Sequence, residues 1–293
     1  MSTRRSIALL AILTAAFAFA VIAAFGIGNV PEGAEARAKG ADAVPAMALA
    51  YVSINADRSG APWQALEVLA AKLPGGAKAL ADLNARLEAS AGMTKALGRD
   101  ISVALLGISI GSGLKPTASA VVVATAADGP GLVQVLEQEG FVPGPALNGA
   151  PVWEKDAFAV TVTGSIAIGA TSRATLRTAL DAQSGAAQSL ADDPSFQTTF
   201  AKLPNDSLVA AYLSPARLAG LVQLAGVLVP QIKDTPGAVQ VITQLAGALK
   251  HLRGLGLAVQ TETTGLRIVA DGDVDEAALM QLGKELSEGW HDG

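Results

Sequence analysis

The chain has 293 residues, of which 51% are hydrophobic but only 4% aromatic, and its formal charge is −5. Without Arg4 and Arg5, the remainder holds 19 basic and 26 acidic residues, a net charge of −7 that argues against nucleic acid or anionic lipid headgroups as partners. The absence of cysteine excludes disulfides, thiolate nucleophiles, cysteine-ligated metals and lipoprotein acylation.

The first predicted element is the apolar segment Ile7–Ile27, whose 21 residues carry no charge and only Thr14 as a polar interruption. As a helix it would measure about 32 Å, close to the thickness of a bilayer's hydrocarbon core. Residues 1–6 contain Arg4 and Arg5, so the positive-inside rule predicts a cytoplasmic N-terminus and an extracytoplasmic domain. The segment exceeds a secretory h-region of about 7–15 residues, but the A-x-A pattern at 34–36 leaves a cleaved signal and a secreted protein as the alternative.

Residues 28–43 are small and charged without an apolar period, which predicts a flexible tether. A globular domain is expected over residues 44–289. Its first part, 44–140, predicts a strand at 49–54, helices at 63–72 and 77–91, paired strands at 100–110 and 117–125, and a helix at 130–139.

Residues 141–202 predict a hairpin-like set of strands at 152–154, 158–163 and 166–170, a helix at 172–182, a polar connector, and a short helix at 194–202. Residues 203–289 then repeat the earlier order: a strand near 210–214, helices at 215–229 and 236–250, paired strands at 252–261 and 266–271, and a helix at 275–288. The recurrence suggests two degenerate copies, 44–140 and 203–289. Chance recurrence of a common order remains the alternative.

Neighbouring strands with short turns predict an antiparallel sheet, and the intervening helices predict a layer covering it. The expected fold class is α+β, a two-layer arrangement of one or two antiparallel sheets under Ala/Leu-rich helices. Several strands also have one large and one small face, as where Leu255, Leu257 and Val259 alternate with Gly254 and Gly256. Small side chains would let helices approach that face closely.

Four stretches carry a family resemblance: VPAMALAYVSINADRSG (44–60), KLPGG (72–76), GRDISVALLG (98–107) and SLADDPSFQTTFAKLPNDSLVAAYLS (189–214). They resemble a bacterial family of membrane-anchored proteins, domain of unknown function 3352, over about Val44 to Leu286. The family's usual aromatic near Leu105–Gly107 is absent. The resemblance implies an exported α+β domain and supplies no catalytic residue.

Little in the sequence indicates catalysis, because the chain has only two histidines, His251 and His291, and no G-x-S-x-G motif. Two distant imidazoles are too few for a usual histidine metal site. The stretch Gly107–Thr117 superficially suggests a phosphate loop, but Pro116 follows Lys115 where a helix would have to begin. A hairpin loop is the preferred interpretation.

Acidic clusters receive structural interpretations. An EF-hand loop beginning at Asp271 would need glycine at its sixth position and glutamate at its twelfth, where this chain has Glu276 and Leu282. The stretch Asp271–Glu276 therefore predicts a strand exit followed by a helix capped by Asp273 or Asp275. Asp192-Asp193-Pro194 predicts a helix start rather than an acid/base pair. The three tryptophans, at 63, 153 and 290, are interpreted as core or interface anchors.

The sequence therefore predicts a membrane-anchored envelope protein that acts by binding or as an interaction module, with no catalytic, cofactor-binding or metal-ligating residue identified. Its expected partners are the membrane, through residues 7–27, and an unknown envelope protein. One alternative is a carrier of a lipid or other apolar ligand held between sheet and helices. Another is a hydrolase that uses two carboxylates roughly 5–10 Å apart.

Overall fold

The computed structural model describes residues 40–57, 59–78, 80–82, 96–110, 116–220, 246–247, 249–262 and 264–274. The expected anchor at 7–27 lies outside these residues, as do most or all of the expected helices at 77–91, 215–229, 236–250 and 275–288. Within the described ranges, no helix combines the length and apolar character needed to cross a membrane.

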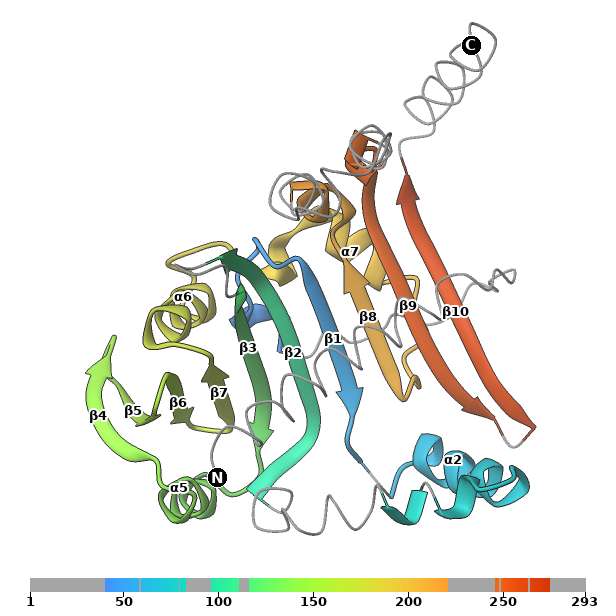
Figure 1. The fold of residues 1–293 in the computed structure, drawn as a ribbon, viewed down its shortest axis with the longest axis horizontal. Coiled ribbons are helices and arrows are strands. Elements are labelled where there is room, and N and C mark those ends of the chain that lie inside the picture. The colour runs from blue at the N-terminus through green and yellow to red at the C-terminus, as the bar shows by residue number, and fades with distance from the viewer. Residues whose placement is uncertain are drawn as a thin grey trace, which may run out of the picture.

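Ten strands form one antiparallel sheet in the order β10-β9-β8-β1-β2-β3-β7-β6-β5-β4 (Figure 1). The sequence left open whether one sheet or two would form, and the direct pairing of β1 with β8 decides for one. The strand bounds are β1 Ala50–Asn55, β2 Leu97–Ile110, β3 Pro116–Ala126, β4 Val142–Leu147, β5 Ala150–Lys155, β6 Phe158–Thr163, β7 Ile166–Ala170, β8 Val209–Leu213, β9 Leu252–Glu262 and β10 Gly265–Val274.

Nine of these strands overlap predicted ones, and the α+β antiparallel class is confirmed. The strand that sequence reasoning missed is β4, which contains Pro143 and Pro145. Proline cannot donate to a ladder and is tolerated at sheet edges. Accordingly, β4 pairs only with β5 and forms one edge of the sheet.

Helix starts follow local capping chemistry. Asp128, Ser172 and Asp193 accept hydrogen bonds from backbone N–H groups at the starts of their helices, and proline lies in the first turn of the helices that follow Asp128 and Asp193. The helices are α2 Ala61–Lys72, α5 Gly129–Gln138, α6 Arg173–Gln183 and α7 Pro194–Phe200, with the 3₁₀ turns η1 Ala41–Ala43 and η2 Leu190–Asp192.

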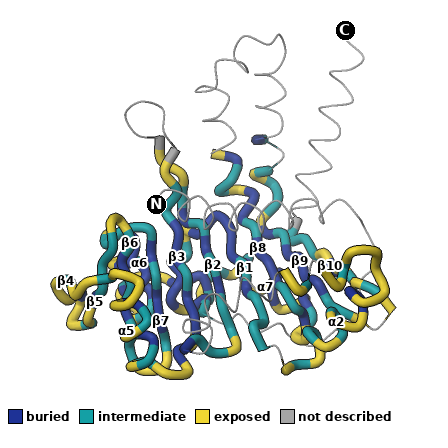
Figure 2. Tube along the Cα trace, turned by 60° about the horizontal axis from the view of Figure 1, so that its bottom comes forward, coloured by how far each residue is buried: buried dark blue, intermediate teal, exposed yellow. Residues whose placement is uncertain are grey.

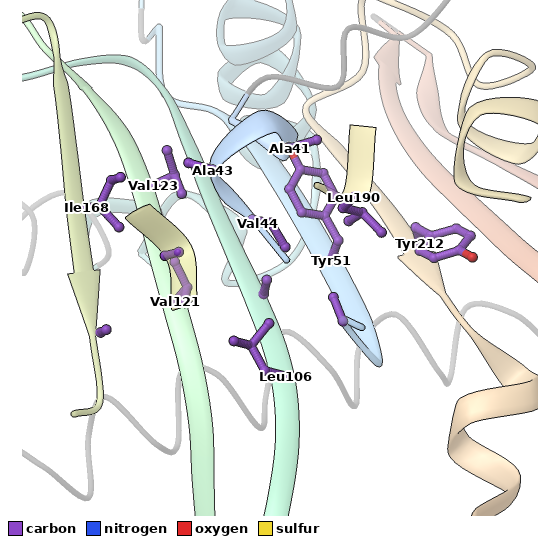
Figure 3. Packing of buried hydrophobic residues seen from close by; sticks show 14 of the residues in the cluster. Ala41, Ala43, Val44, Tyr51, Leu106, Val121, Val123, Ile168, Leu190 and Tyr212 are labelled. Carbon is purple, nitrogen blue, oxygen red and sulfur yellow. The ribbon is translucent and has the colours of Figure 1, made fainter. Parts of the chain in front are cut away.

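The largest core cluster lies on one face of the sheet, where Tyr51 and Val121 meet residues of η1, α6 and α7 (Figure 3). A second cluster forms on the opposite face, where Leu132 and Leu136 of α5 pack with Ala167 of β7. Because side chains alternate along a strand, the neighbouring residues Ala167 and Ile168 reach different faces and different clusters. Helices thus touch both faces, which corrects the expected two-layer arrangement.

The globular domain begins before the predicted boundary at Val44. Ala41 and Ala43 in η1 are buried together with Val44, and the segment continues into a bridge between Pro45 and Ser189. Residues 40–43 therefore belong to the core rather than to the tether. Small residues without an apolar period were interpreted as flexible, whereas here their small size lets a tight turn pack directly on the sheet.

Candidate functional site: the large-residue sheet face

Over residues 101–105 of β2, the two sides of the strand differ in side-chain size, and the larger residues lie on the less buried side. In β2, Ser102 and Ala104 are buried, whereas Ile101, Val103 and Leu105 are only partly buried. Burying a large aliphatic side chain is worth about 1.5–3 kcal/mol, so a strand normally turns its largest residues toward the main core. We call the face bearing Ser102 the small-residue face and the face bearing Val103 the large-residue face.

The same division occurs in β9, where Gly254 and Gly256 lie beneath α7. A Cβ atom on Gly256 would come within 2.7 Å of Thr199 Cγ2, and one on Gly254 within 2.5 Å of Thr199 Oγ1. The predicted close approach of a helix to a small-residue face is therefore confirmed. It also means that the aliphatic residues of β9 lie on the other side of the sheet.

The large-residue face runs across six adjacent strands. Its partly or fully exposed aliphatic members include Val52 and Ile54 of β1, Ile101, Val103, Leu105 and Ile108 of β2, Val122 of β3, Val209 and Leu213 of β8, Leu255 of β9, and Leu266 and Ile268 of β10. Polar residues on this side, Thr261 of β9 and Arg99 of β2, lie toward the ends of their strands. The most exposed aliphatic members are Leu266 at 48%, Ile108 at 40% and Ile268 at 39%.

Two helices, α2 and α5, border the large-residue face. Thr261 Oγ1 in β9 donates a hydrogen bond to the Pro62 carbonyl at the start of α2, and Trp63 Nε1 donates to the Asn55 carbonyl over 2.7 Å. On the other side of the sheet's centre, α5 packs against β6 and β7. In Figures 1 and 2, α2 and α5 lie toward opposite ends of the row of strands, with β1, β2 and β8 between them.

The small-residue face, by contrast, holds a dry aromatic cluster. Tyr51 and Tyr212 pair directly across β1 and β8, and both contact Phe196 edge-on, at centroid distances of 5.4 and 5.1 Å. Phe200 stacks on Phe196 at 4.8 Å. Such packing stabilises the core and leaves no room for a ligand at this position.

Burial raises the pKa of both tyrosines to about 12. The Tyr51 hydroxyl lies 2.9 Å from Ser102 Oγ in hydrogen-bond geometry, whereas the Tyr212 hydroxyl is buried without a hydrogen-bond partner. For Tyr212, Asp193 raises the pKa further, and Arg217 opposes it. No phenolate nucleophile is expected near neutral pH from either residue.

Asp192 and Asp193 occupy the structural positions expected from the sequence. Asp193 caps α7 by accepting from the Phe196 N–H, and it also accepts from Arg217 Nη2 at 2.6 Å. Asp192 belongs to a capping box in which the Ser189 hydroxyl and N–H hold the pKa of its carboxyl below the usual value. Their interpretation as a helix start is confirmed.

The remaining candidates are separated in space. The strands β2 and β3 pair antiparallel from Leu97–Ala126 to Ile110–Pro116, as a hairpin requires, while residues 111–115 lie outside the described residues. Asp273 lies within β10 and so is not a helix cap, while the alternative cap, Asp275, falls outside the described residues. His251 directly precedes β9, and His291 and Trp290 also fall outside the described residues.

The described part of the chain shows no grouping of metal-ligating side chains, and one small cavity lies beside the sheet. Its Asp, Glu and His residues form no group of three or more that could hold a metal ion. One cavity of 80 Å³ lies beside Gly40, Asp100 and Ser102 on the small-residue face. A drug-sized ligand needs about 300–1,000 Å³, so this cavity would hold only a few water molecules.

Comparison with known proteins gives a fold-level likeness only. No family model and no curated protein matches the chain, so the resemblance described above stays a prediction. Crystal forms III and IV of TP0453 are similar with TM-scores of 0.42, at 9% and 10% identity, covering 80% and 78% of this chain and 79% and 78% of theirs. Crystal form I has a TM-score of 0.41 at 9% identity, covering 82% of this chain and 81% of that one. We draw no functional argument from a likeness of this size.

The feature that sequence reasoning missed is the exposure of the large-residue face. The signal lies in the alternation of large and small residues in β9. This alternation predicts that helices approach the small side. The consequence for the other side depends on where the helices lie, which alternation alone does not reveal.

Proposed function

We propose that the protein is an extracytoplasmic binding protein of the bacterial envelope, anchored by residues 7–27, whose large-residue face binds an apolar helix face of a partner protein. The observation that carries this proposal is the placement of Ile101, Val103 and Leu105 on the less buried side of β2 while Ser102 and Ala104 occupy the core side. A contiguous apolar surface of this kind is typical of interaction sites.

A helix is favoured as the occupant because an apolar sheet face is ordinarily covered by helices, and α2 and α5 already pack at the two sides of this one. The exposed aliphatic residues provide shape and apolar area without charge. Specificity would then come from polar groups at the rim, such as those of α2.

A second candidate is a lipid-binding protein, favoured by the same uncharged aliphatic surface close to a proposed membrane anchor. In this case an acyl chain would lie along the face rather than inside a cavity. The 80 Å³ cavity is too small to hold a lipid, so the expected internal site does not gain support from it. The carboxylate hydrolase gains no comparable support, since Asp193, Asp271 and Glu154 each lie opposite a basic side chain.

The binding proposal can be tested with a photo-crosslinking amino acid placed in the full chain, in intact membranes. Incorporation at Val103 and at Leu213 should give the same adduct, because the two positions lie on one face. Incorporation at the exposed Arg177 of α6, on the other side of the sheet, should not. Adding Val103→Asp should reduce the Leu213 adduct at least fivefold, since it places a charge in the contact area.

Each outcome has a defined meaning. A protein-sized adduct with this pattern supports the main proposal, and a lipid-sized adduct replaces it with the second candidate. A folded protein that gives no adduct, or equal adducts at Arg177, overturns both. Location is tested separately: Arg177→Cys introduces the chain's only thiol, and a membrane-impermeant maleimide should label it in spheroplasts without permeabilisation.

We also propose that segments 44–140 and 203–289 are degenerate copies. Supporting this, β1–β3 and β8–β10 are each three-stranded antiparallel units, and they meet at the β1–β8 pair. Tyr51 is the third residue of LAYVS (49–53) and Tyr212 the third residue of AAYLS (210–214), and the two tyrosines are direct partners in the β1–β8 pair. A two-fold relation through that pair would place equivalent residues opposite each other.

A further inference from the structure

The two edges of the sheet differ in how far they can accept another strand. At one edge, β4 contains Pro143 and Pro145, and the guanidinium of Arg173 donates to the carbonyls of Pro145 and Ala146. At the other edge, β10 spans ten residues without a proline. Among the described residues, no side chain hydrogen-bonds to its backbone. An edge strand of this length that no described residue protects is a template for pairing with another chain.

We propose that β10 pairs antiparallel with β10 of a second copy of this chain, about a two-fold axis at Val269. This register places Arg267 of each chain opposite Asp271 of the other on the small-residue face. On the large-residue face it places the exposed Ile268 opposite Ala270 and the exposed Leu266 opposite Gly272. Charge is thus matched with opposite charge, and each large side chain lies opposite a small one.

The local environments of the two charged residues favour this pairing. Within the described part of the chain, Arg267 has no ion-pair partner. Asp271 has only Lys202, whose Nζ lies 3.3 Å from Oδ2, and that buried oxygen still lacks a hydrogen bond. A guanidinium brought opposite Asp271 would supply donors to this carboxylate.

Neighbouring registers fit less well. Moving the partner strand by one pair in either direction sets Val269 opposite Asp271 or opposite Arg267. The first of these registers still sets Arg267 opposite Asp273, but in both of them Asp271, whose buried Oδ2 lacks a hydrogen bond, no longer faces a cation of the other chain. Shifting the partner strand by an odd number of residues would place the small-residue face of one copy beside the large-residue face of the other. The proposed register keeps both faces continuous across the dimer. It does not depend on what binds the large-residue face.

The test uses the absence of cysteine, since a single introduced thiol can pair only with its copy in a second chain. Full-length Val269→Cys in membranes should give at least tenfold more oxidised dimer than Leu266→Cys. Opposed residues in an antiparallel pair have Cα atoms about 4.5–5.5 Å apart, within disulfide range. The two copies of residue 266 would be about 20 Å apart along the strands, since each residue adds about 3.4 Å.

Charge and surface variants sharpen the test. In the Val269→Cys background, Arg267→Asp should reduce the dimer at least tenfold, because it places two carboxylates opposite each other. Ile268→Lys should reduce it more than Ile108→Lys, a matched control of similar exposure in β2. Circular dichroism establishes that each variant is folded. A folded Val269→Cys chain that remains monomeric, equal crosslinking at Leu266, or stronger crosslinking at Ala270→Cys would each overturn the proposed pairing.

Discussion

The units β1–β3 and β8–β10 have the same strand order but different coverings. Tyr51 in the first unit and Tyr212 in the second face the same aromatic cluster. Ser102 lies two residues before the β2 partner of Tyr51, and Gly254 lies two residues before the β9 partner of Tyr212. Ser102 gives Tyr51 a hydrogen bond. Gly254 instead lets Thr199 of α7 come close, and Tyr212 is left without a partner.

The difference shows how one strand order can carry two kinds of packing. In the first unit, a serine on the strand satisfies the buried phenol, and η1 covers the sheet. In the second, glycines remove side chains from the strand, so the helix itself supplies the contact surface. Close helix packing is obtained there, whereas one buried hydroxyl remains unsatisfied, which costs about 1–3 kcal/mol when such a group is buried.

The largest expected effect is a substitution that breaks the close packing of the second unit. Gly256→Ala should lower the free energy of unfolding by about 1–3 kcal/mol, because the new Cβ would lie 2.7 Å from Thr199 Cγ2. Gly107→Ala in β2 is the matched control, since a Cβ there meets nothing within 4 Å. Urea denaturation measures both. Adding Thr199→Ser should restore part of the loss at 256, and no recovery would contradict the proposed clash.

Removing the N-cap residues of α7 and α5 should change the stability by different amounts. Asp193→Ala removes both the cap of α7 and the ion pair with Arg217, so we expect a loss of about 1–3 kcal/mol. Asp128→Ala removes only an exposed cap of α5 and should cost about 0.5–1 kcal/mol. Thermal unfolding of the two variants compares them, and equal losses would show that the Arg217 contact adds nothing.

Removing each phenol hydroxyl tests the comparison most directly. Tyr51→Phe deletes a hydrogen bond to Ser102 and should destabilise by about 0.5–1.5 kcal/mol. Tyr212→Phe removes a buried hydroxyl that has no partner, so we expect no loss or a small gain in stability. Chemical denaturation decides, and an equal loss in both variants would mean that Tyr212 has a compensating interaction.

The smallest expected effect is in the alkaline titration. The chain has only two tyrosines, and burial raises the pKa of both to about 12. Because the pKa in the folded state lies above the unfolded value of about 10, the contribution of the neutral tyrosines to the free energy of unfolding is complete below pH 10. It is lost as the pH rises from 10 to 12. Absorbance at 295 nm should show that few tyrosine side chains are ionised at pH 10 in the folded protein, and that about half are ionised in urea. Half-ionisation in the folded state would contradict the burial.

Local pattern predicted most of the secondary structure in the described residues. Period-two alternation identified nine of the ten strands, and residues such as Asp193-Pro194 and Ser172 marked helix starts. The strand β4 escaped because its two prolines are turn signals except at an edge, and being an edge is a property of the whole sheet. The buried turn at Ala41–Ala43 escaped because burial of small residues depends on what packs over them.

The sequence by itself determined the antiparallel α+β class, the apolar segment at 7–27, and the division of strands into large and small faces. These follow from length, charge and period, which act over a few residues. Only the tertiary structure decided that the strands form one sheet and that Tyr51 meets Tyr212. Those outcomes depend on contacts between segments more than 100 residues apart, whose energies no local pattern encodes.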